Sequence, residues 1–172
     1  VERTTIASAS CGICGKASID DVVERCAPVV PTARLSAAAL GTLPSALRTA
    51  QPVFDRTGGL HAAALVGVGA GGAVQIEMVR EDVGRHNAVD KLIGAAALAQ
   101  TLPLTGRLLL LSGRCSFELV QKAAAAGIGA IACIGAPSDL AVETAERLGI
   151  CLIGFLRDNS LNVYTERERV SS

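Results

Sequence analysis

Hydrophobic and polar positions divide the chain into a polar beginning and a long remainder in which apolar residues recur with regular spacing. Short apolar runs and alternating stretches predict strands, whereas apolar residues three and four positions apart predict helices. Strands are predicted over 62–68, 74–78, 108–111, 128–134, 150–155 and, as a short edge strand, 162–165. Helices are predicted over 82–100, 116–126 and 138–148, and a polar tail is predicted over 166–172.

The beginning of the chain carries a weaker pattern. Residues 1–18 are rich in Ser, Gly and Cys and predict a loop. Pro28 and Pro31 interrupt the next stretch, because the residue before a proline is disfavoured in a helix. Short helices are predicted over 19–26, 36–40 and 44–50. We therefore predict two parts: a cysteine-containing loop with short helices over 1–50, and a second domain over 51–172.

The order of the predicted elements in the second part is β-β-α-β-α-β-α-β. Continuous apolar strands separated by helices are typical of parallel strands with helices on both faces. The first two strands flank the glycine-rich turn at 69–72 and predict an antiparallel hairpin. We predict an α/β fold, a three-layer sandwich around a mixed, mostly parallel sheet. This order resembles the cytidine-deaminase-like fold more closely than a generic doubly wound sheet.

Composition narrows the class of protein. The chain has 172 residues, 50% of them hydrophobic and only 2% aromatic, and its formal net charge is zero. Without an excess of positive charge or aromatic stacking platforms, we expect no nucleic-acid partner. No apolar run approaches the roughly 18 residues of a membrane span, and we expect no signal peptide in residues 1–5. Six cysteines, several beside apolar runs, indicate reduced thiols and a cytoplasmic protein.

The segment Cys11-Gly12-Ile13-Cys14 is the first chemical signal. A structural zinc site needs further ligands, and no second close cysteine pair is present. A thioredoxin-like pair follows a strand, which is not predicted here. The pair also suits a mobile sulfur-handling loop, in which one thiolate accepts sulfur as a persulfide and its neighbour releases or protects it. Two loop cysteines without any role remain a further alternative.

The other four cysteines are interpreted by their surroundings. Cys133 and Cys151 lie in predicted buried strands, and Cys26 ends a helical stretch. Cys115 opens a predicted helix, and among these four it alone is a candidate for a role in a site.

Two glycine–arginine turns form the second signal: Gly84-Arg85-His86 and Ser112-Gly113-Arg114. Both precede or open predicted helices, whose first N–H groups attract anions. The alternative is that each arginine pairs with a nearby carboxylate such as Glu81, Asp82, Asp90 or Glu118. Because the two turns occupy equivalent positions at the carboxyl ends of strands, we favour one ligand crevice. His61, which follows two glycines, is a further candidate for that crevice.

A zinc deaminase is not expected. That chemistry requires a glutamate two residues after the first ligand and a Pro-Cys-x-x-Cys segment on the next helix. Ala88 stands where the glutamate would follow His86, and Cys115 is a single cysteine. We therefore predict that the fold keeps the crevice and holds no zinc or other metal.

Several long motifs strongly resemble the formate dehydrogenase accessory sulfurtransferase family. They extend in order over almost the whole chain. They are Ser10-Cys11-Gly12-Ile13-Cys14-Gly15-Lys16, Thr57-Gly58-Gly59-Leu60-His61-Ala62-Ala63, Glu81-Asp82-Val83-Gly84-Arg85-His86-Asn87-Ala88-Val89-Asp90-Lys91, Ser112-Gly113-Arg114 and Asn162-Val163-Tyr164-Thr165.

This resemblance implies a deaminase-like fold, a homodimer and a function in sulfur transfer. It implies that sulfur passes from a cysteine desulfurase to Cys11, with Cys14 as its partner. The sulfur then passes to the bis-molybdopterin guanine dinucleotide cofactor before insertion into formate dehydrogenase. The alternatives are a non-catalytic chaperone that holds this cofactor, and a redox sensor with a reversible disulfide.

The resemblance also implies a cofactor-binding segment after the last long strand. With the glycine–arginine turns, it completes a predicted site that should accept GDP as an analogue of half of the cofactor. The predicted cofactor-binding residues are His61, Arg85, His86, Ser112, Arg114, Phe155, Leu156, Arg157, Asp158, Asn159 and Ser160.

Overall fold

The computed structural model describes residues 26, 29–31 and 33–171. A six-stranded sheet with the order β3-β2-β4-β5-β6-β7 forms its centre. The central strands β4, β5 and β6 are parallel, and the neighbouring pairs are antiparallel. The strands are β2 (His61–Val68), β3 (Val74–Asp82), β4 (Arg107–Leu111), β5 (Ala130–Cys133), β6 (Cys151–Arg157) and β7 (Ser160–Val163).

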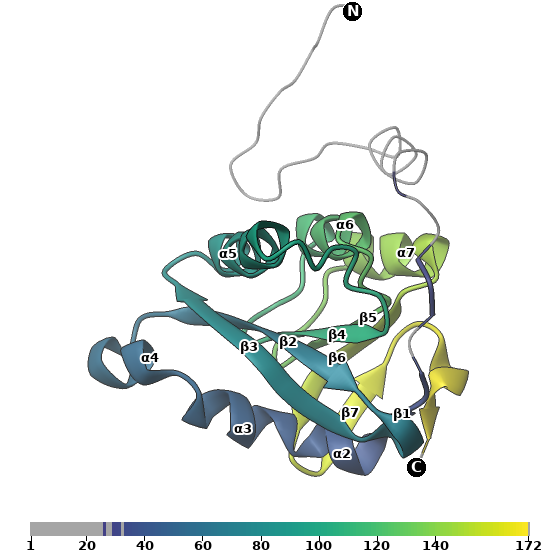
Figure 1. Ribbon diagram of the computed structural model, residues 1–172. Coiled ribbons are helices and arrows are strands. Elements are labelled where there is room, and N and C mark those ends of the chain that lie inside the picture. Colours follow the sequence, from purple (N-terminus) through teal and green to yellow (C-terminus); the bar gives the residue numbers. More distant parts are fainter. Residues whose placement is uncertain (1–25, 27–28, 32, 172) are drawn as a thin grey trace, which may run out of the picture.

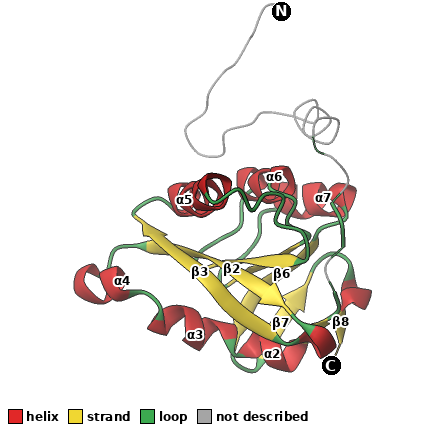
Figure 2. Ribbon diagram, viewed as in Figure 1, coloured by secondary structure: helices red, strands yellow, loops and turns green. Residues whose placement is uncertain are grey.

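Helices cover both faces of this sheet, as Figures 1 and 2 show. One layer contains α5 (Arg85–Leu98), α6 (Phe117–Ala125) and α7 (Asp139–Leu148). The opposite layer contains α2 (Ala37–Gly41), α3 (Leu43–Thr49) and α4 (Pro52–Thr57). The hairpin between β2 and β3 turns through the short helix η1 (Ala70–Gly72). The predicted three-layer α/β sandwich around a mixed sheet is therefore confirmed.

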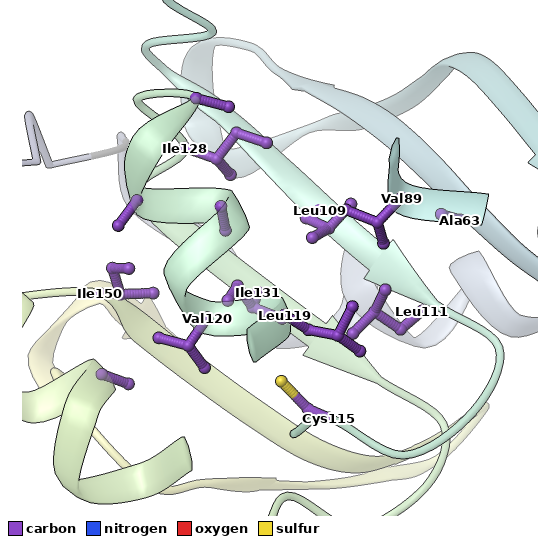
Figure 3. Packing of buried hydrophobic residues seen from close by; sticks show 14 of the residues in the cluster. Ala63, Val89, Leu109, Leu111, Cys115, Leu119, Val120, Ile128, Ile131 and Ile150 are labelled. Carbon is purple, nitrogen blue, oxygen red and sulfur yellow. The ribbon is translucent and has the colours of Figure 1, made fainter. Parts of the chain in front are cut away.

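The core beneath α5, α6 and α7 is aliphatic, as the low aromatic content requires. Figure 3 shows Leu109 and Leu111 of β4 beside Val89 of α5 and Leu119 of α6. Each of these side chains is at most 2% exposed. Burying one such side chain contributes roughly 1.5–3 kcal/mol, so this layer is fixed on the sheet mainly by apolar area.

A second core lies on the other face of the sheet. Leu40, Leu43 and Leu47 of the short helices pack with strand residues such as Leu108 and Ile153. The short helices before residue 50 thus supply one layer of the sandwich. The predicted boundary between 1–50 and 51–172 stays a prediction, and the predicted helix over 19–26 lies almost entirely outside the described residues.

Two features differ from the sequence-based expectation. The predicted polar tail instead contains η2 (Arg167–Arg169) and β8 (Val170–Ser171), which pairs in parallel with β1 (Leu35–Ser36). Two-residue strands are too short to leave a periodic pattern. The sequence analysis also did not predict the helix α4. The beginning of this helix is fixed by a residue of the distant strand β3, since Glu81 accepts hydrogen bonds from the N–H groups of Val53 and Phe54 at 3.0 and 2.8 Å.

Among the described residues, none of the helices combines the length and the apolar character that a membrane crossing needs. The cytoplasmic location stays a prediction.

Candidate functional site at the strand ends

Four segments that are distant in sequence meet at one edge of the sheet. The carboxyl ends of β4 and β5 align through the pair Leu111 and Cys133, and β2 begins at the same edge opposite the end of β3. The following loops continue this alignment, because Gly135 N–H donates to Gly113 O and Phe155 N–H donates to Gly135 O, each at 3.0 Å. The predicted residues of the crevice therefore all lie near this edge.

The sheet divides these residues between its two faces. On the α3 and α4 side, His61 and Ser112 line a cleft of about 490 Å³. The cleft is lined by Pro44, Arg48, Gln51, Phe54, Gly58, Gly59, Leu60, His61, Ser112 and Ile134. Of the predicted cofactor-binding residues, only His61 and Ser112 line the cleft. The sequence analysis did not predict Gln51 and Phe54 as lining residues.

Ser112 and His61 are both placed to contact a ligand. Ser112 Oγ accepts a hydrogen bond from Ala62 N–H at 2.8 Å, which leaves the hydroxyl proton available for another acceptor. The His61 ring packs against Gly113, where an added Cβ would lie 3.2 Å from Nδ1. Glycine at 113 therefore allows the imidazole to approach the loop backbone.

A polar cluster lies on the α5 and α6 side of the same edge. His86 Nε2 is 2.9 Å from Ser116 Oγ, and Ser116 Oγ donates to Glu118 Oε2 at 2.6 Å. His86 Nε2 is also 3.3 Å from Glu118 Oε2. The pKa of Glu118 is lowered overall. Burial acts to raise it, but the hydrogen bond from Ser116, a backbone hydrogen bond and the contact with His86 together outweigh the effect of burial. Ser116 was not predicted, and its position before α6 was the only available signal.

The carboxylates proposed as structural partners for the arginines have other partners. Glu81 fixes the beginning of α4, and Glu118 belongs to the cluster with His86. Asp90 pairs with Lys122 on α6. Hydrogen bonds from Lys91, from Gly84 N–H and from Asn87 lower the pKa of Asp82 to about 2.

The arginines themselves are left without such partners in the described part of the chain. Arg85 Nε is enclosed and makes no hydrogen bond there. Arg114 is exposed, and its backbone runs beside Gly135. Both guanidinium groups can therefore bind an anion without first breaking an ion pair.

The segment after β6 is only partly accessible. Phe155 has a left-handed backbone with φ of 51° and a side chain that is 42% exposed. Leu156 is fully buried in the second core, so only its backbone can contact a ligand. Arg157 Nη1 donates to Ile134 O at 2.6 Å and to Leu156 O at 2.8 Å. Asp158 and Asn159 form an exposed turn that leads to Ser160, the exposed first residue of β7.

The thiols in the described structure are poor nucleophiles. Cys115 is 1% exposed, and Figure 3 shows its sulfur in the aliphatic core, so the described structure gives no support for a role of this thiol in the site. Burial raises its pKa well above the usual value; Cys133 raises it further, while Arg85 opposes the shift. Burial likewise raises the pKa of Cys133 to about 12 and that of Cys151 to about 11. The pKa of Cys26 is also raised by burial. Cys11 and Cys14 lie outside the described residues.

Zinc binding is expected to be absent. In the described residues, no group of three or more His, Cys, Asp or Glu side chains could hold a metal ion. The buried Cys115 thiol also resists the deprotonation that zinc ligation requires. Elemental analysis of zinc-dialysed protein should show no stoichiometric zinc, and one tightly held zinc per chain would overturn this prediction.

Comparison with known proteins identifies the family. The model of the FdhD/NarQ family matches residues 1–171. The chain belongs to this family.

Curated relatives of this FdhD/NarQ chain carry the name sulfur carrier protein FdhD. The chain is 52% identical to the protein from Mycolicibacterium paratuberculosis over 172 residues, and 53% identical to that from Mycobacterium tuberculosis over 173 residues. These matches cover 99% of this chain and 62% and 61% of the relatives. The chain therefore spans about three fifths of the length of the curated relatives it matches.

A solved structure agrees with the fold of the FdhD/NarQ chain. It is the crystal structure of a protein from Desulfotalea psychrophila, assigned as a formate dehydrogenase accessory protein. The TM-score is 0.74 at 28% sequence identity, and the match covers 88% of this chain and 62% of that one.

The backbone at Phe155 is expected to be strained in this FdhD/NarQ chain. A left-handed conformation costs a residue with a Cβ roughly 1–2 kcal/mol, and glycine avoids this cost. Phe155→Gly should therefore be about 1 kcal/mol more stable than Phe155→Ala in urea unfolding, since both remove the same partly exposed ring. Equal stability of the two variants would contradict the strain.

Proposed function

We propose that this chain is a sulfur carrier that serves the maturation of formate dehydrogenase, with Cys11 as the persulfide cysteine. The observation that carries the proposal is the burial of the other cysteines. Cys115, Cys133 and Cys151 are buried, Cys26 is half-buried against the core, and the pKa of each of these four thiols is raised. Cys11 and Cys14 are therefore the cysteines not assigned to the core, and the name of the curated relatives supports sulfur transport.

Loading is a thiol exchange between two persulfides. The Cys11 thiolate attacks the terminal sulfur of a persulfide on a cysteine desulfurase. The sulfur–sulfur bond of the donor breaks, the donor thiolate leaves, and Cys11 becomes the persulfide. No net oxidation occurs, because one persulfide is exchanged for another.

Release uses the second cysteine. The Cys14 thiolate attacks Cys11 Sγ, the terminal sulfur leaves as hydrosulfide, and a disulfide joins the two cysteines. The two thiols lose two electrons, and the transferred sulfur gains them. A cellular dithiol reductant then restores both thiols for the next cycle.

The acceptor is the bis-molybdopterin guanine dinucleotide cofactor, bound as a substrate. Its pyrophosphates suit the free guanidinium groups of Arg85 and Arg114 near the beginnings of α5 and α6. His61, Ser112 and the exposed turn after Phe155 flank the same edge of the sheet. The proposed partners are a cysteine desulfurase, formate dehydrogenase and a second copy of this chain.

A pre-loading experiment separates a carrier from a cofactor-holding chaperone. The chain is incubated with a desulfurase and sulfur-labelled cysteine, freed from both, and added together with sulfur-free cofactor to cofactor-free formate dehydrogenase. A carrier transfers label and activates the enzyme only after loading. A chaperone delivers no label and gives the same activity with and without loading, and that result would overturn the proposal.

A further inference from the structure

The side-chain amide of Gln51, a buried residue, has no hydrogen-bond partner among the described residues. Its residue is 5% exposed, and it precedes α4 without donating to or accepting from that helix through its side chain. Within the described part of the chain, Arg85 Nε is the one fully enclosed unpaired side-chain atom. The Gln51 amide therefore still reaches the open space of the cleft that it lines. Buried amides normally pair with protein or ligand groups, since an unpaired one is costly.

The remaining walls of this cleft suit a flat ring. Apolar groups come from Pro44, Phe54, Leu60 and Ile134. The guanidinium of Arg48 lies over the Phe54 ring, 4.7 Å from its centroid, and pairs with Asp55, so this wall combines an aromatic ring with a cation. A volume of about 490 Å³ is within the range of small-molecule sites.

The position of Gln51 is fixed by the surrounding structure. The Glu81 carboxylate binds the N–H groups of Val53 and Phe54, which directly follow Pro52 in the first turn of α4. Gln51 O also accepts a hydrogen bond from Asp55 N–H at 3.1 Å. The backbone of Gln51 is thus held before a ligand arrives, which reduces the entropy lost on binding.

We infer that Gln51 recognises the hydrogen-bonding edge of a planar heteroaromatic ring seated in this cleft. Its amide presents a donor beside an acceptor, which matches a ring carbonyl next to a ring N–H. Guanine and pterin share this edge. The inference rests on the proposed function, because the cofactor carries both rings. The Ser112 hydroxyl and His61 lie in the same cleft, so the ring edge and its polar substituents have partners.

The test compares Gln51→Leu with Gln75→Leu, a control at an exposed glutamine of β3 that does not line this cleft. GDP, neopterin and pyrophosphate are titrated calorimetrically into the full chain. Gln51→Leu should weaken binding of GDP, of neopterin or of both at least about tenfold, as expected for one bidentate amide contact. The control should stay within about twofold of the wild type. Pyrophosphate, which has no ring, should bind both variants like the wild type.

The two ring ligands distinguish the source of the ring. A loss confined to GDP assigns guanine to the cleft, and a loss confined to neopterin assigns pterin. Unchanged affinity of Gln51→Leu for both overturns the inference and leaves the sulfur-carrier proposal intact. Failure of the wild type to bind either ring also overturns it, whereas failure of the pre-loading experiment overturns only the proposed function.

Thermal unfolding excludes a merely structural role. Without ligand, Gln51→Leu should unfold at about the wild-type temperature, because the amide reaches the open cleft and loses no hydrogen bond from within the described structure. With GDP or neopterin, the variant should lose the rise in melting temperature that the wild type shows. A lower melting temperature without ligand would mean that the amide supports the fold, contrary to the inference.

Discussion

Replacing Cys11 with alanine is expected to abolish sulfur delivery while the fold and the affinity for GDP stay unchanged. The cores on both faces of the described sheet form without Cys11, and the residues proposed to bind the nucleotide belong to other segments. The expected loss is complete, since the persulfide would have no atom on which to form. Transfer of radiolabelled sulfur to formate dehydrogenase measures it, and Cys14→Ala should load sulfur normally but release it slowly.

Cys26→Ala is the matched control for this prediction. Cys26 is a half-buried thiol whose pKa is raised by burial, so its removal should leave sulfur delivery at the wild-type level. Full delivery by Cys11→Ala, or loss of delivery in Cys26→Ala alone, would contradict the assignment. Melting temperatures of both variants show whether a loss arises from chemistry or from unfolding.

Replacing Arg114 with alanine is expected to weaken GDP binding about tenfold or more. Each charge-assisted phosphate contact contributes roughly 1.5–3 kcal/mol, and about 1.4 kcal/mol changes affinity tenfold. Arg114 is exposed and has no ion-pair partner in the described structure, so its loss should not destabilise the fold. Arg85→Ala should have a similar effect at one phosphate, as calorimetric titration can measure.

Arg34→Ala serves as the control for the arginine variants. Arg34 is an exposed arginine whose backbone lies beside Gly72 in the β2–β3 turn, at the opposite end of the sheet. Its replacement should leave GDP affinity nearly unchanged. If Arg114→Ala binds GDP like the wild type while Cys11→Ala does not, the separation of nucleotide anchor from sulfur carrier is wrong.

The central elements of the fold could be predicted because each carries its own pattern. The apolar run at 108–111 and the helix expected over 138–148 agree with β4 and α7 to within one residue at each end. The pairing of β1 with β8 and the helix α4 could not be predicted in the same way. They depend on contacts over long sequence separations, such as Leu35 with Val170 and Glu81 with Val53.

The sequence predicted the edge of the sheet at which the candidate site lies, but not most of the residues that line its cleft. Glycine–arginine turns after strands indicated the edge of the sheet at which the cleft and the polar cluster lie, because carboxyl ends of parallel strands meet there. Their division between two faces follows from side-chain directions that the sequence does not reveal. Gln51 carries no motif, and its burial beside the cleft arises only when α4 packs on the sheet.

The most direct test of the sulfur-carrier account is to map the added sulfur by peptide mass spectrometry. The wild-type chain is incubated with a cysteine desulfurase and cysteine, and its peptides are analysed under non-reducing conditions. The account predicts one additional sulfur atom on the peptide that contains Cys11. Sulfur found instead on Cys26, Cys115, Cys133 or Cys151, or on no peptide, would contradict it.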